Sequence, residues 1–79
     1  MFEFNDWESY DGDLASDIAL VESRGIRSFA PTRDSPVTAT VQNHLDLYAA
    51  GFDVAYTYNL ANAVEARIQV NEENGVAPP

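Results

Sequence analysis

The apolar positions of residues 13–24 recur with the period of an α-helix. Leu14, Ile18 and Val21 stand at i, i+4 and i+7, which places their side chains on one face of a helix. The segment Asp11-Gly12-Asp13 is typical of a turn and a helix start, with an acid well placed for the dipole at the helix N-terminus, and a glycine follows the last residue as a stop signal. The pattern therefore predicts a helix over this range.

Two more helices are predicted, at about residues 36–50 and 54–70. Ser35 and Pro36 favour a helix start, because serine caps a first turn and proline fits its first position. Asp53 is placed to cap the third helix. The second helix has the apolar face Val37, Val41, Leu45 and Tyr48, and the third has Tyr56, Leu60, Ala63, Val64 and Ile68.

The last of these segments has a second interpretation, a β-hairpin. Residues 54–60 and 64–71 alternate apolar side chains with small or polar ones, which is the pattern of paired strands. The alanines of this region favour helix, and residues 61–63 contain no glycine, aspartate or proline to form a tight turn. The sequence thus predicts a mainly α fold, a small three-helix domain, with an α+β fold carrying a C-terminal hairpin as the alternative.

A chain of 79 residues is sufficient for one domain. We expect an extended, acidic and aromatic arm at residues 1–12, a single helical domain at 13–71 and a tail at 72–79. A chain of this size buries only about 60% of its unfolded surface. Without cysteine it forms neither a disulfide nor a thiolate metal site. Its stability must come from efficient helix packing or from a partner.

The charge balance is strongly acidic. Thirteen Asp and Glu residues stand against four arginines and no lysine, which gives a formal net charge of −9. Such a charge repels phosphates, so we expect no direct binding to nucleic acid or to an anionic membrane. Carboxylate excess without lysine is typical of proteins in molar salt, where a Debye length of about 3 Å screens self-repulsion. A halophilic source is one explanation, and a GC-rich genome that favours arginine codons is the other.

The sequence predicts a soluble protein, cytoplasmic or part of a virion. The first residues lack the basic and apolar regions of a secretory signal peptide. No apolar run approaches the roughly 20 residues that cross a bilayer, because Asp46 and Asp53 interrupt the best candidate.

One acidic segment partly matches the calcium-binding loop of an EF-hand. Asp11, Asp13 and Glu22 fall at loop positions 1, 3 and 12. Position 6 is Ser16, where the sharp turn requires glycine, and position 5 is Ala15, which cannot ligate. The segment is better interpreted as an acidic helix start.

Catalytic motifs are also missing from the sequence. His44 is the only histidine, and one imidazole without cysteine makes no zinc site by itself. No nucleophile elbow frames any of the serines, and the glycines form neither a dinucleotide-binding nor a P-loop motif. We therefore expect no enzyme, no cofactor and no metal, and we expect His44 to pack beside Leu45 at the boundary of the core.

Two groups of residues are candidates for binding a partner protein. Residues 1–23 carry seven acids and no base, and residues 24–33 carry three arginines and no acid. The arginines suit docking against carboxylates, including those of a second copy in a head-to-tail contact, or else they complement a helix dipole in a solvated loop. The aromatic rings of the arm suit an interface, or else cover the chain's own core. The candidate partner-binding residues are Phe2, Phe4, Trp7, Tyr10, Arg24, Arg27 and Arg33.

These observations predict a non-catalytic structural protein. It would be an assembly subunit of a larger multi-protein particle and would act through protein–protein contacts. A minor virion component, from the capsid or tail of a halophilic virus, fits the acidic composition and the thin core. The alternative is an acidic regulatory or inhibitory protein that binds a basic, nucleic-acid-binding partner as a charge mimic.

Overall fold

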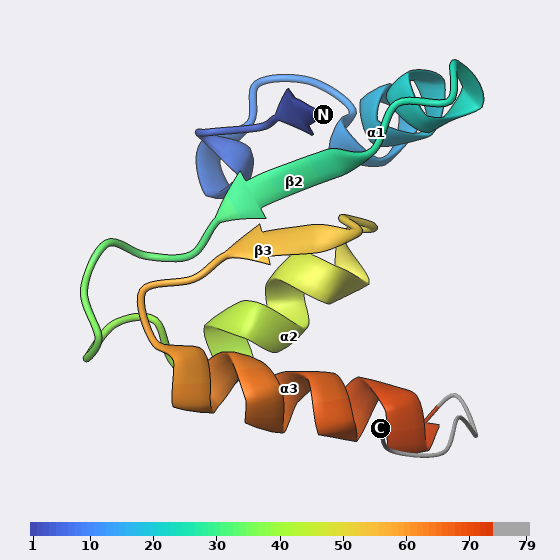
Figure 1. Ribbon diagram of the computed structural model, residues 1–79. Coiled ribbons are helices and arrows are strands. Elements are labelled where there is room, and N and C mark those ends of the chain that lie inside the picture. Colours follow the sequence, from blue (N-terminus) through green and yellow to red (C-terminus); the bar gives the residue numbers. More distant parts are fainter. Residues whose placement is uncertain (74–79) are drawn as a thin grey trace.

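Three short strands form one sheet, and helices connect and flank them (Figure 1). The computed structural model describes residues 1–73. The strands are β1 (Phe2–Glu3), β2 (Ser28–Pro31) and β3 (Val54–Tyr56). The helices are the 3-10 helix η1 (Trp7–Ser9) and the α-helices α1 (Leu14–Ser23), α2 (Val41–Ala49) and α3 (Leu60–Glu73).

The sheet is parallel throughout, with β2 in the centre and the strand order β1-β2-β3. Each crossover between neighbouring strands contains an α-helix, as parallel pairing requires. α1 packs on β2, and α2 packs on both β3 and α3. The chain therefore has a Rossmann-like βαβ arrangement of the α/β class.

The predicted three-helix domain is wrong, and so is its hairpin alternative. Residues 1–12, predicted as an extended arm, contribute β1 and η1. Residues 54–70, predicted as one helix, are divided between β3 and α3. Residues 64–71, the second strand of the hairpin alternative, lie inside α3. The segment between the first two predicted helices contains β2, the central strand.

The strand β2 ends on a proline, which normally argues against a central strand because proline lacks the N–H for the ladder. On the side of β1, Phe4 N donates to Phe29 O at 2.9 Å, and beyond it the chain turns into η1. Every second residue of a strand directs its backbone nitrogen to the same side, so the nitrogen of Pro31, like that of Phe29, faces the side of β1. At the level of Pro31, however, β1 has already ended. The carbonyl of Pro31 accepts a hydrogen bond from Trp7 Nε1 at 2.8 Å. The missing N–H therefore costs the sheet no hydrogen bond.

The second helix starts later than predicted because two capping signals stand in succession. Ser35 Oγ accepts from Thr38 N at 3.1 Å and closes an isolated turn. Thr40 Oγ1 then accepts from Asn43 N at 3.1 Å as the N-cap of α2. The sequence prediction places the helix start at the first of these signals, Ser35, whereas α2 begins after the second.

The division of the third predicted helix follows from a cap at Asn59. Its Oδ1 accepts from Asn62 N at 3.1 Å and satisfies an N–H of the first turn of α3. Before this cap the chain continues as a strand, with Ala55 beside Ala30 in register. Asp53, expected as the cap, is exposed just before β3 begins.

Helix α1 is capped by Asp13, the residue that the sequence suggested. Asp13 Oδ1 accepts from Ser16 N at 3.1 Å, and Asp13 Oδ2 accepts from Ser16 Oγ at 2.9 Å. The backbone hydrogen bond from Ser16, followed by the side-chain bond, lowers the pKa of Asp13 from its usual 3.8.

The substitution Asp13→Ala should destabilise the fold in a pH-dependent way. Because the folded-state pKa is the lower one, the carboxylate stabilises the fold above pH 3.8, and this contribution is lost as the pH falls through the folded-state value. Urea unfolding should show a lower midpoint for the variant near neutral pH and a difference that closes in acid. Asp13→Asn keeps an acceptor and should lie between the two. A difference that stays equal at every pH would contradict this account.

Two rings of the predicted arm lie in the core of the domain. Phe4 and Trp7 are buried, and their ring centroids lie 5.5 and 5.9 Å from that of Phe52. Ile18 from α1 and Leu47 from α2 belong to the same cluster. Residues 1–12 are therefore held against the sheet and the helices by apolar packing as well as by the β1 ladder.

Within residues 1–73, no helix combines the length and apolar character needed to span a membrane. Of the predicted tail at residues 72–79, Glu72 and Glu73 end α3. The remaining tail residues, 74–79, lie outside the described part of the chain.

Candidate functional site

Open parallel sheets usually bind their ligands at the carboxyl ends of the strands. In this protein, the chain's own side chains fill much of that edge. Trp7 donates to the carbonyl of Pro31, and Arg33 Nη2 lies 3.0 Å from Glu8 Oε2, the one ion pair within residues 1–73. A hollow of about 530 Å³ remains beside them, but its one arginine, Arg33, is paired with Glu8 and two carboxylates line it, so it is unsuited to phosphate.

His44 is fully buried and does not lie at the boundary of the core, where the sequence placed it. Its Nδ1 lies 2.7 Å from Thr40 O, and its Nε2 lies 2.7 Å from Thr57 Oγ1. A carbonyl oxygen can only accept, so Nδ1 carries a hydrogen and donates it to Thr40 O, while Nε2 pairs with the Thr57 hydroxyl, which also donates to Asn59 O at 3.0 Å. The imidazole thereby ties α2 to the loop between β3 and α3, and both of its nitrogens are engaged.

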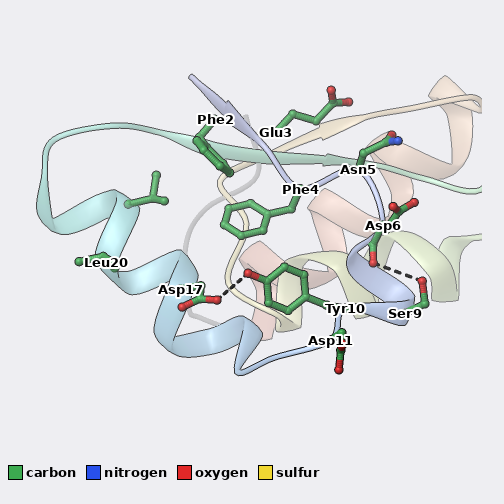
Figure 2. A pocket seen from close by; sticks show the side chains of 11 residues that line it. Phe2, Glu3, Phe4, Asn5, Asp6, Ser9, Tyr10, Asp11, Asp17 and Leu20 are labelled. Atoms are coloured by element: carbon green, nitrogen blue, oxygen red, sulfur yellow. Dashed lines mark hydrogen bonds between the residues drawn. The ribbon is translucent and has the colours of Figure 1, made fainter.

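A groove of about 760 Å³ lies between β1 and η1 on one side and α1 on the other (Figure 2). Its floor is largely apolar. The ring centroids of Phe2 and Phe4 are 5.0 Å apart, and those of Phe4 and Tyr10 are 5.8 Å apart. Leu20 and Val21 complete the floor from α1. Phe2 remains 48% exposed and Leu20 56% exposed, so the floor is open to solvent.

Three carboxylates lie along this groove. Asp6, Asp11 and Asp17 line it, and Glu3 lies at its edge, on the opposite side of β1 from the phenylalanine rings (Figure 2). The Tyr10 hydroxyl donates to Asp17 Oδ2 at 2.5 Å, and this hydrogen bond raises the pKa of Tyr10. The bond links the segment after η1 to α1 and fixes the ring that closes one end of the groove. The groove therefore combines an apolar floor with a negative rim.

The connection between α1 and β2, Arg24–Arg27, lies at one end of the groove, and we call it the arginine loop. Phe2 N donates to Arg27 O at 2.8 Å, and Ile26 N donates to Val21 O at 3.4 Å, so the loop abuts two lining residues. Ile26 is 42% exposed between the two arginines. Both arginine side chains are exposed, and neither forms an ion pair in the part of the chain that the structure describes.

The four aromatic residues predicted to bind a partner divide by burial. Phe2 and Tyr10 are exposed in the groove, whereas Phe4 and Trp7 lie in the chain's own core. Leu20 was missed by sequence reasoning, because it falls outside the apolar face that the helical period selects for α1. Leu20 becomes a candidate only when residues 1–12 are known to lie alongside α1, and this is a tertiary feature.

The three predicted arginines also divide. Arg24 and Arg27 share the arginine loop beside the groove. Arg33 lies at the carboxyl end of β2, and its guanidinium donates to both carboxylate oxygens of Glu8 at 3.3 and 3.0 Å. This hydrogen bonding to Glu8 raises the pKa of Arg33. Arg33 is therefore engaged within the chain, and only the other two arginines have free guanidinium groups next to the groove.

Within residues 1–73, no group of three or more histidine, aspartate or glutamate side chains is arranged to hold a metal ion. No family model, curated protein or solved structure matches this chain. The groove and the arginine loop are therefore interpreted from their own geometry.

Proposed function

We propose that this protein is a non-catalytic assembly subunit whose groove binds a cationic, partly apolar segment of a protein. The observation that carries the proposal is the exposed apolar floor of Phe2, Tyr10 and Leu20 within a rim of carboxylates. An arginine or lysine side chain complements both parts, because its aliphatic stem can lie on the apolar floor while its charged head reaches a carboxylate.

A second exposed apolar region supports a role in assembly. Tyr56 and Tyr58 have ring centroids 5.6 Å apart, and with Leu60 and Val64 they leave large apolar side chains in solvent around the end of β3 and the start of α3. Exposed apolar patches of this kind are typical of protein–protein contacts. β3 is also an edge strand of the sheet.

The acidic surface supports assembly in molar salt. All thirteen carboxylates except that of Asp17 belong to exposed residues. At high ionic strength their mutual repulsion is screened. The proposal therefore extends to a particle of a halophile, such as a minor virion component of a halophilic virus.

The charge-mimic hypothesis requires a different surface from that of an assembly subunit. A mimic of phosphate needs carboxylates alone, and its binding weakens steeply with added salt. The exposed rings favour the groove, since burial of an apolar floor persists when salt screens the charges. Salt dependence of binding separates the two functions.

Binding of a short peptide with two arginines flanking a leucine should test the groove. In an NMR titration we expect the amide signals of Phe2, Tyr10 and Leu20 to shift. Leu20→Ser should weaken binding at least about tenfold, because it removes the apolar floor and the peptide leucine loses its contact. Leu60→Ser makes the same change on the other exposed region and should leave binding unchanged.

A peptide with glutamate in place of both arginines should not bind. Shifts confined to residues outside the groove, or equal effects of the two leucine substitutions, would contradict the proposed function.

A further inference from the structure

We infer that the occupant of the groove is the arginine loop of a second copy of this chain, a step that rests on the proposed function. The loop presents Ile26, 42% exposed, between two free guanidinium groups. The groove presents an apolar floor between carboxylates. The two surfaces therefore match in composition, because each combines exposed apolar side chains with charges opposite to those of the other.

The backbone conformation of the arginine loop keeps it exposed for such a contact. Gly25 has φ +74°, a left-handed conformation that reverses the chain after α1, and no atom beyond the adjoining residues lies within 4 Å of the place a Cβ would take. The carbonyl of Arg27 is held by Phe2 N at 2.8 Å, so the loop is fixed at the end of its own groove and cannot fold into it. A copy from outside is required to bring the two surfaces together.

The adjacency of loop and groove also allows the contact to be reciprocal. Because both lie beside Phe2 on one molecule, two copies related by a two-fold axis can each place a loop in the partner's groove. A head-to-tail chain of copies would use the same residues. The measured mass of the assembly distinguishes these two arrangements. In both of them the arginine loop of one copy lies in the groove of another.

Salt should affect this contact in the opposite way to a contact with a basic protein. Each copy has a formal net charge of −9, so two copies repel one another over long distances at low ionic strength. Salt shortens the Debye length to about 3 Å at 1 M, which removes this repulsion and strengthens apolar burial. Self-association should therefore strengthen as salt is added.

A charge-exchange experiment with the full chain tests the inference. The loop variant Arg24→Glu with Arg27→Glu and the groove variant Asp6→Arg with Asp11→Arg should each weaken self-association at least about tenfold in sedimentation equilibrium. An equimolar mixture of the two variants should recover association, because the acidic loop of one fits the basic groove of the other. None of these four side chains makes a hydrogen bond in the described structure, so both variants should retain the wild-type circular dichroism.

A matched control places the same charge change elsewhere. Asp34→Arg with Asp53→Arg alters exposed carboxylates outside the groove and should leave self-association intact. If the wild-type chain stays monomeric at all salt concentrations but the arginine–leucine peptide binds the groove, the second-copy inference is overturned and the proposed function stands. If neither binds, both are overturned. Self-association that resists both variants would also overturn the inference.

Discussion

Replacing Trp7 with alanine should remove a large part of the free energy of unfolding. The side chain is buried against Phe52 at a centroid distance of 5.9 Å, and its Nε1 donates to Pro31 O at 2.8 Å. Loss of a buried tryptophan typically costs about 3–5 kcal/mol. A chain of this length has a free energy of unfolding of only about 4–12 kcal/mol. We therefore expect a large drop in the urea midpoint, measured by far-ultraviolet circular dichroism, or complete unfolding.

Trp7→Phe separates the two contributions of the ring. It keeps an aromatic ring against Phe52 but loses the bond to the Pro31 carbonyl and part of the buried ring volume, so the loss should be about 1–2 kcal/mol, smaller than for alanine. Leu60→Ala, at a residue that is 72% exposed, is the matched control and should change the midpoint little. A Trp7→Ala protein as stable as this control would show that residues 1–12 do not share the core.

Replacing His44 with alanine should cost about 2–4 kcal/mol, because it opens a cavity and removes two hydrogen bonds at once. The side chain has no exposed surface, and its nitrogens lie 2.7 Å from Thr40 O and from Thr57 Oγ1. The fold should loosen first where α2 meets the loop before α3. Hydrogen exchange at the amides of this loop should accelerate more than exchange in α1.

A double-mutant cycle with Thr57→Val tests the role of the imidazole. Thr57→Val keeps the volume of the side chain but removes the hydroxyl that bonds to His44 Nε2 and to Asn59. If the imidazole acts through that hydroxyl, the combined loss should be smaller than the sum of the two single losses by about 0.5 kcal/mol or more. Strict additivity would mean that the contact between His44 Nε2 and the Thr57 hydroxyl adds nothing to stability.

The helical parts of the fold were accessible from the sequence, and the sheet was not. The period of Leu14, Ile18 and Val21 and the cap at Asp13 define α1 because a helix is stabilised by residues within a few positions of one another. The strands are two to four residues long and pair only with distant segments. The alternation over residues 54–60 favoured a strand of a hairpin, but only its first three residues form β3, and their partner is β2. β2 moreover contains a proline that is tolerated only because β1 ends before it reaches Pro31.

The candidate site was accessible in part for the same reason. Local charge segregation identified Arg24 and Arg27, and aromatic content identified Phe2 and Tyr10. Their contact with Leu20 depends on how the first strand lies along α1, which no local pattern encodes. A large apolar ring suits both a protein interface and a small core, so the sequence alone could not assign Trp7 to one of them. In the structure it lies in the core.

The position of Trp7 gives the chain an internal optical reporter. It is the only tryptophan, and it lies where η1 meets the end of β2 and Phe52. Its fluorescence emission therefore responds to the docking of residues 1–12, while circular dichroism responds mainly to the helices. A red shift of emission with helical signal intact would mark a state in which β1 has left the sheet. In that state the edge of β2 is uncovered, and an uncovered edge is where sheet proteins begin to form fibres.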